Sequence, residues 1–203
     1  MNKELSNLTI IILTFCTDLK ILIKCIKSIE GSVKIVIVEN SKKFAHKEEI
    51  LKINSKIDIV CTGENLGYGG GNNFGLNLTK TDYALILNPD VICKDDYFQN
   101  LTQYINQEID FSIIGSQYHD NEQHKPFGFF NKKKDLDKEK KLYMPDLDVA
   151  DWVVGCSLLI NLKKFQTKKL FDENFFLFFE EFDLCKKIKK KGGNVYSSKK
   201  LII

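Results

Sequence analysis

The acidic side chains best placed to do chemistry fall into two groups. Asp90 closes the turn Asn88-Pro89-Asp90 directly after an apolar run. Glu180, Glu181 and Asp183 follow an aromatic run near the end of the chain. A carboxylate can hold a hard cation through its oxygens, or it can take a proton from an attacking hydroxyl. The second group would equally suit the first turn of a helix, whose dipole favours negative charge, so both interpretations of Glu180 and Asp183 stay open.

A glycine-rich run, residues 64–75, lies shortly before the turn that holds Asp90. Its glycines at 67, 69, 70 and 71 permit positive φ and a close backbone approach to a ligand, and its asparagines at 65, 72 and 73 offer hydrogen bonds. A Walker phosphate loop would end in Gly-Lys-Ser or Gly-Lys-Thr, and a dinucleotide fingerprint would follow the first strand. Neither condition is met, so the run predicts a nucleotide-sugar site, with a plain loop before a helix as the alternative.

Composition limits the classes of protein. The 203 residues, 43% of them hydrophobic, suffice for one domain, and a net charge of +3 gives no argument for nucleic acid. Lysines gather at 132–141 and 186–191, where they could meet a diphosphate or anionic lipid or simply face solvent. Six scattered cysteines without a Cys-X-X-Cys spacing indicate reduced thiols, and no run is long enough to span a bilayer. We expect a cytoplasmic protein, with peripheral contact at the inner face of the membrane left open.

Strand and helix patterns alternate through the first 90 residues. Apolar runs predict buried strands at 8–14, 33–38, 57–61 and 83–87. Helical periodicity occupies 19–29 and 47–53, and a further helix follows the glycine run to about residue 79. This order predicts a doubly wound α/β fold with a mostly parallel sheet.

The pattern changes after Asp90. We predict a helix at 95–106, a strand at 111–115, and a strand at 152–160 that Gly155 interrupts. The polar stretch 118–148 is a candidate acceptor loop. A basic helix ends at Gly192-Gly193, and a terminal strand covers 195–203.

Five patches, in this order, resemble the family 2 glycosyltransferases of the GT-A fold, especially rhamnosyltransferase-like members. They are Leu13-Thr14-Phe15, Val38-Glu39-Asn40-Ser41, 65–75, Leu87-Asn88-Pro89-Asp90 and 171–185. The resemblance covers essentially the whole chain as one GT-A domain. It implies a nucleotide-binding half at 1–90 and an acceptor and catalytic half at 91–203, with helices on both faces of the sheet.

The resemblance implies how a sugar would be transferred. Glu181 matches the catalytic base of an inverting enzyme, with Asp183 beside it, and Asp90 matches a ligand of Mg²⁺ or Mn²⁺ that holds the donor diphosphate. No protein nucleophile is needed for this reaction. The absence of a convincing Ser-His-Asp or Cys-His set is compatible with that class.

The resemblance also implies which residues bind the nucleotide sugar. Thr14, Phe15 and Glu39 would contact the nucleoside, and Gly155 would permit close approach of the sugar. The remaining implied contacts come from the glycine run and the metal turn: Asn65, Gly67, Asn73, Asn88 and Asp90.

The function implied is transfer of a sugar, with rhamnose favoured, from a nucleotide diphosphate donor to a glycan or lipid-linked glycan. Relatives generally continue past the terminal strand, whereas this sequence stops at Ile203, so we interpret it as lacking the usual C-terminal extension. An inactive or partner-dependent nucleotide-sugar-binding protein is one alternative, and a nucleotidyltransferase is another. A homo-oligomer or a partner transferase also stays open.

Overall fold

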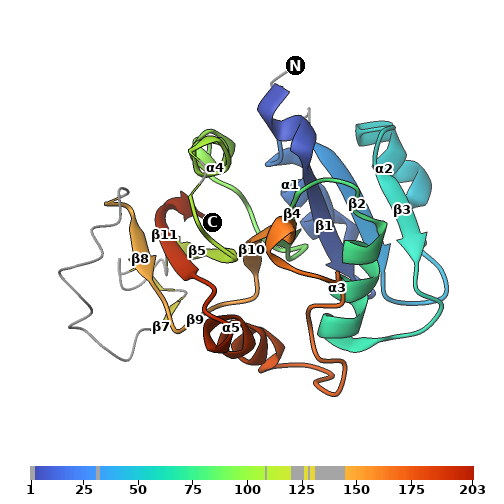
Figure 1. Ribbon diagram of the computed structural model, residues 1–203. Helices are drawn as coiled ribbons and strands as arrows, with labels where there is room; N and C mark the ends of the chain where they lie inside the picture. The colour runs from blue at the N-terminus through green and yellow to red at the C-terminus, as the bar shows by residue number, and fades with distance from the viewer. Residues whose placement is uncertain (1–2, 31–32, 108, 120–125, 128, 131–144) are drawn as a thin grey trace.

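A mixed β-sheet in the order β3-β2-β1-β4-β10-β5-β11-β8 forms the centre of the fold (Figure 1). The computed structural model describes residues 3–30, 33–107, 109–119, 126–127, 129–130 and 145–203. Strands β3, β2, β1 and β4 pair in parallel. Strand β10 is antiparallel to both β4 and β5, so β5 runs in the same direction as β4. Strand β11 pairs with β5 in parallel. The prediction of a mostly parallel sheet is confirmed.

The first half of the chain follows the predicted alternation closely. Its strands are β1 (Leu8–Thr14), β2 (Lys34–Glu39), β3 (Asp58–Cys61) and β4 (Tyr83–Leu87). Its helices are η1 (Lys3–Asn7), α1 (Leu19–Lys27), α2 (Lys47–Ile53) and α3 (Gly67–Leu78). The Asp18 carboxylate caps α1 by accepting from the backbone N–H groups of Lys20 and Ile21, at 2.9 and 3.2 Å.

The second half adds the remaining strands, two α-helices and a short 3₁₀ helix. The helices are α4 (Tyr97–Asn106), η2 (Leu162–Lys164) and α5 (Glu180–Lys190). The strands are β5 (Ile113–His119), β6 (Pro126–Phe127), β7 (Phe129–Phe130), β8 (Leu147–Val149), β9 (Trp152–Val153), β10 (Ser157–Asn161) and β11 (Val195–Ile202). The predicted strand at 152–160 is therefore two strands that part around Gly155, and β9 pairs with β7 outside the main sheet.

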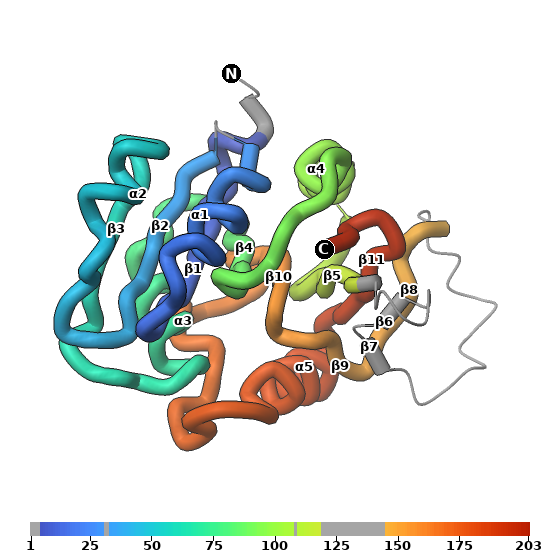
Figure 2. Tube along the Cα trace, turned by 180° about the vertical axis from the view of Figure 1, so that it is seen from behind, coloured from blue at the N-terminus to red at the C-terminus, as the bar shows by residue number. Residues whose placement is uncertain are grey.

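Helices cover both faces of the sheet, as predicted. Buried side chains of α1, α2 and α4 belong to one apolar cluster, and those of α3 and α5 belong to another. Figure 1 and the reverse view in Figure 2 show α1 and α3 on opposite sides of the strands. Strands such as β1 are buried on both faces, which is why their sequences are continuously aliphatic.

The glycine run differs from its prediction. It forms the first two turns of α3 instead of a loop, and of its glycines only Gly67 has positive φ, at 74°. A Cβ at Gly71 would overlap the Leu13 side chain, and one at Gly75 would lie 2.6 Å from Cγ2 of Ile11. Glycines four residues apart thus let one face of α3 approach β1 more closely than a side chain would allow.

The stretch 118–148 was predicted to be a long loop. The described part contains β6, β7 and most of β8, which pair with β5, β9 and β11. The candidate acceptor loop otherwise falls at 120–125, 128 and 131–144, outside the described residues.

Candidate functional site

The predicted site residues gather at one edge of the sheet. Thr14, Glu39 and the Asn88–Asp90 turn follow or end β1, β2 and β4, whose carboxyl ends share this edge. Antiparallel β10 begins here too, because Ser157 pairs with Leu87. Ligands of open α/β sheets bind beyond such an edge.

Glu39 is buried at the end of β2, beside Thr14. Its carboxylate accepts from the Thr14 hydroxyl at 2.7 Å and from the Ser41 hydroxyl at 2.6 Å. A carboxylate has about four acceptor positions, so capacity for another donor remains. Phe15 follows Thr14 in the sequence, so it lies at the same edge, and its side chain is 53% exposed.

Asn40 organises the loop that leads into α3, a role the sequence prediction missed. Its amide donates to Oδ1 of Asn65 and to the Gly67 carbonyl at 2.9 and 3.0 Å. Its Oδ1 accepts from the Leu66 N–H at 3.0 Å and the Thr62 hydroxyl at 3.3 Å. An asparagine directly after a buried strand was the available signal, since such a side chain can replace missing backbone partners.

Gly67 and Asn73, which the sequence predicts as nucleotide-sugar contacts, are packed against other parts of the protein. The Gly67 N–H donates to Asn65, its carbonyl accepts from Asn40, and a Cβ on it would overlap the Phe176 carbonyl. Its missing side chain therefore makes room for protein backbone. Asn65 is exposed, so it stays a predicted contact.

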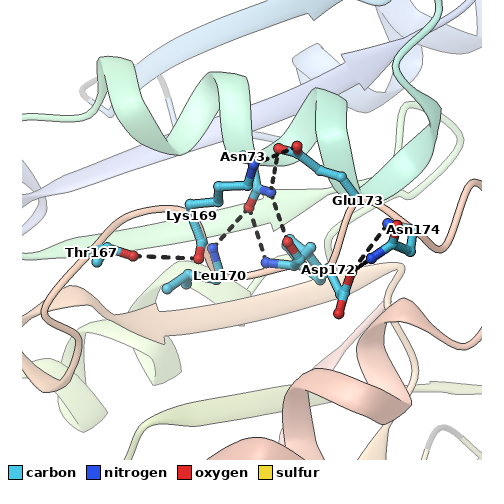
Figure 3. A network of polar contacts seen from close by, with 8 residues as sticks. Asn73, Thr167, Lys169, Leu170, Asp172, Glu173 and Asn174 are labelled. Carbon is cyan, nitrogen blue, oxygen red and sulfur yellow. Dashed lines mark hydrogen bonds and ion pairs between the residues drawn. The ribbon is translucent and has the colours of Figure 1, made fainter.

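Asn73 joins α3 to the segment that precedes α5 (Figure 3). Its Oδ1 accepts from the N–H groups of Leu170 and Phe171 at 2.9 and 3.0 Å. Its amide donates to the Phe171 carbonyl at 2.9 Å and to Glu173 at 3.1 Å. All four hydrogen-bonding positions of the side chain are filled, which leaves none for a nucleotide.

Tyr68, also missed by the prediction, connects three segments of the site. Its hydroxyl donates to the Gly155 carbonyl at 2.6 Å, and its backbone N–H donates to the Phe176 carbonyl at 2.9 Å. Burial raises the pKa of Tyr68 well above its usual value, and the charges of Glu181 and Glu180 raise it further. The Tyr68 ring therefore lies among the acids of α5 and the Gly155 backbone. Gly155 itself is held in place by this bond.

Cys156 lies beside the turn that holds Asp90. The Asn88 N–H donates to the Cys156 carbonyl at 2.9 Å, which fixes the metal turn against the start of β10. Burial raises the pKa of the Cys156 thiol to about 11, with smaller contributions from the charges of Asp90 and Glu181. The charges of Asp90, on the turn after β4, and Glu181, on α5, therefore both reach this thiol.

The acids of α5 have different surroundings. Asp183 pairs with Lys187 at 2.6 Å, so this proposed catalytic residue has a structural partner. Glu180 is buried, and this burial raises its pKa, as does the charge of Glu181. Among the described residues, Oε2 of Glu180, Oε2 of Glu181 and Oδ1 of Asn72 are buried without a hydrogen-bond partner.

The candidate cation site at Asp90 offers few protein donor atoms. No group of three His, Cys, Asp or Glu side chains in the described ranges could enclose a metal. Mg²⁺ commonly binds through one or two carboxylates, substrate phosphates and water, and Mn²⁺ also prefers oxygen ligands. Exposed Asp90 therefore fits a cation that a diphosphate helps to hold.

A cavity lies on the other face of the sheet. A cavity of about 920 Å³ between α1 and α4, lined by Lys24, Phe98 and Thr102 among others, is on the opposite face of the sheet from α3 and α5. In the part of the chain that the structure describes, no helix combines the length and apolar character needed to cross a membrane.

Three curated relatives align with most of this chain at low identity. The chain is 28% identical to the low-salt glycan biosynthesis hexosyltransferase Agl10 of Haloferax volcanii, over 90% of the chain and 65% of that protein. It is 25% identical to rhamnosyltransferase WbbL of Escherichia coli, covering 79% of the chain and 68% of the relative. It is 21% identical to the dTDP-rhamnosyl transferase RfbF of Shigella flexneri, covering 89% and 62%. The chain thus spans about two thirds of the length of these relatives.

A solved structure shows the fold of this chain, and a family model shows its family. The crystal structure of GalNAc-T7 with UDP, GalNAc and Mn²⁺ matches with a TM-score of 0.75 at 13% identity, over 97% of this chain and 43% of that one. This similarity confirms the predicted GT-A fold. The model for glycosyl transferase family 2 matches residues 9–165. With that match over most of its length, the chain belongs to glycosyl transferase family 2.

Proposed function

We propose that this protein is an inverting, metal-dependent glycosyltransferase. It moves a sugar from a nucleotide diphosphate donor to a hydroxyl of a glycan or lipid-linked glycan. The observation that carries the proposal is the placement of the Asp90 turn at the carboxyl edge of the sheet, where Asn88 bonds the Cys156 carbonyl and the charges of both Asp90 and Glu181 reach the Cys156 thiol. One carboxylate is free to bind a cation there, and the other has an oxygen without a partner among the described residues.

On the donor side, Asp90 would hold Mg²⁺ or Mn²⁺. The cation would offset the charge that develops on the departing diphosphate. Thr14, Phe15, Glu39 and Asn65 would bind the nucleoside. The exposed Phe15 ring supports a contact with the base, and the spare acceptor positions of Glu39 support a contact with ribose hydroxyls.

On the acceptor side, Glu181 acts as the general base. It takes the proton of the acceptor hydroxyl while that oxygen forms a bond to the anomeric carbon. The bond from this carbon to the diphosphate oxygen breaks, and the electron pair leaves with the nucleoside diphosphate. Attack opposite the leaving group inverts the configuration. Asp183, paired with Lys187, would position the start of α5.

Unpartnered oxygens around Tyr68 support a substrate rich in hydroxyl groups. Oδ1 of Asn72 and Oε2 of Glu181 are acceptors that need donors, because an unsatisfied buried polar atom costs about 1–3 kcal/mol. Sugar hydroxyls can supply those donors when a substrate displaces the present packing. Rhamnose is the favoured sugar, because two of the similar proteins are named rhamnosyltransferases.

Calorimetry and turnover test the proposal together. We expect uridine or deoxythymidine diphosphate sugars to bind more tightly with Mn²⁺ or Mg²⁺ than without. Asp90→Ala should remove that metal response. Asp95→Ala, which removes the same charge from an exposed position further along the chain, should keep it. Glu181→Gln should lower transfer by about 10²–10⁴-fold with nearly unchanged donor binding.

Three outcomes would contradict these assignments. Normal turnover of Glu181→Gln would remove the base, and an unchanged metal response in Asp90→Ala would remove the cation ligand. Release of pyrophosphate in place of nucleoside diphosphate would indicate a nucleotidyltransferase. Glu48→Gln is the control for Glu181→Gln, because it makes the same substitution in the first turn of a helix on the opposite face of the sheet. Its rate of transfer should equal that of the parent.

A further inference from the structure

A cluster of apolar side chains protrudes from the surface just before α5. We call residues 176–179, Phe-Leu-Phe-Phe, the aromatic knuckle. Phe176 and Leu177 are 58% and 54% exposed, and Phe178 and Phe179 are each 68% exposed. Four consecutive large apolar residues at such exposure form a contiguous patch, which is typical of an interaction surface.

The backbone holds this knuckle in an unfavourable conformation. Phe178 and Phe179 have φ values of 71° and 70°, a left-handed geometry that costs an L-residue about 1–2 kcal/mol. Backbone hydrogen bonds tie both ends: Tyr68 N–H to the Phe176 carbonyl at 2.9 Å, and Asp183 N–H to the Phe179 carbonyl at 2.9 Å. The fold thus maintains both the strain and the exposure, and an apolar partner would offset the exposure.

The side of α5 next to the knuckle carries a row of aromatic and basic residues. Phe179, Phe182, Lys186 and Lys190 recur at spacings of three and four, so they share one side of the helix. Phe182 is 42% exposed, and the two lysines are also exposed. No carboxylate among the described residues forms an ion pair with Lys186 or Lys190, whereas Lys187 and Lys189 pair with Asp183 and Asp151.

We propose that the aromatic knuckle and this row of α5 bind the surface of an anionic lipid bilayer. Exposed phenylalanines can enter the boundary between headgroups and acyl chains, and lysines attract anionic headgroups. A second copy of the chain is the alternative partner, and the vesicle test below distinguishes it. The positive charge beside the apolar patch is what selects an anionic surface.

Bilayer binding goes beyond sugar transfer and needs no turnover. The knuckle directly precedes Glu180 and Glu181, so docking would bring the start of α5 to the lipid surface. A hydroxyl acceptor carried on a lipid would then meet Glu181 from the membrane side. Failure of vesicle binding would leave the donor-binding and Glu181→Gln tests unaffected.

Vesicle co-sedimentation of the full chain tests the proposal. We expect binding to vesicles of phosphatidylcholine with phosphatidylglycerol and much weaker binding to phosphatidylcholine alone. Phe178→Asn with Phe179→Asn removes the rings but tolerates left-handed φ, so folding should persist. This variant should bind the anionic vesicles more weakly by about tenfold or more. Lys186→Gln with Lys190→Gln should weaken vesicle binding by about 25-fold, from roughly fivefold for each lysine near an anionic surface.

Matched controls lie on the opposite face of the sheet. Lys20→Gln with Lys24→Gln removes the same charge from exposed positions of α1, and Ile92→Asn removes an apolar side chain that is 51% exposed. Both should bind vesicles as the parent does. Equal losses in controls and test variants would overturn the proposal, as would binding to neither vesicle or equal binding to both. Concentration-dependent dimers that the asparagine variant abolishes, without vesicle binding, would assign the surface to a second copy instead.

Discussion

The loop after β2, in the first half of the chain, and the start of α5, in the second half, differ in how completely their polar groups are hydrogen-bonded. In the first half, Glu39 accepts from two hydroxyls, and Asn40 makes four hydrogen bonds. In the second half, Glu180 and Glu181 each have a buried oxygen with no partner among the described residues. The aromatic knuckle beside them is exposed and strained.

The hydrogen-bonded residues Glu39 and Asn40 form a fixed framework, whereas Glu180 and Glu181 keep oxygens that a ligand could use. Satisfied polar groups fix a loop in one geometry, whereas an unsatisfied one is a cost that a ligand can remove. The halves meet along α3, where Asn73 and Gly67 contact the 170–176 segment. Substitutions at those contacts and at Glu180 test the comparison.

Asn73→Ala should have the largest effect on folding. It leaves the N–H groups of Leu170 and Phe171 without their acceptor in a buried region, so we expect a loss of about 3 kcal/mol or more in unfolding free energy. Urea denaturation measures it, with exposed Asn106→Ala as the control. Unchanged stability together with weaker donor binding would instead return Asn73 to the nucleotide site.

Gly67→Ala should destabilise the chain more than Gly63→Ala. Both glycines have positive φ, at 74° and 89°, but a Cβ at Gly63 meets nothing within 4 Å while one at Gly67 overlaps a backbone carbonyl. Backbone strain of about 1 kcal/mol is common to both, and overpacking adds about 1–3 kcal/mol at Gly67. The difference between their urea midpoints measures the contact between the halves. Equal losses would show that α3 and the 176 segment are not tightly packed.

Glu180→Gln should have a smaller effect, of opposite sign. Burial raises the pKa of Glu180 above 4.5, so above that pH the folded state binds more protons than the unfolded state. The contribution of Glu180 to stability therefore falls as pH rises through 4.5 toward its folded pKa. The variant should melt higher than the parent at neutral pH, and the gap should narrow below about pH 4. A lower melting temperature at neutral pH would mean that ionised Glu180 stabilises the fold.

The sequence predicted β1, α2 and β4 at their observed bounds, because hydrophobic periodicity reports which faces are buried. It also placed Asp90 and Glu181 as a pair of functional carboxylates, through the resemblance of their motifs. The glycine run was predicted as a ligand loop because glycine signals close approach without saying what approaches. The approaching groups are Leu13, Ile11 and the Phe176 carbonyl.

The sequence by itself determined the alternation of strands and helices, the family and the acids at the ends of particular elements. Those properties depend on local patterns that can be read along the chain. Only the tertiary structure decided that Asn73 bonds the segment before α5 and that Tyr68 holds Gly155. These contacts join residues that are 98 and 87 positions apart in the sequence. The type of a side chain gives its capacity for hydrogen bonds, but only the folded chain determines which partner it meets.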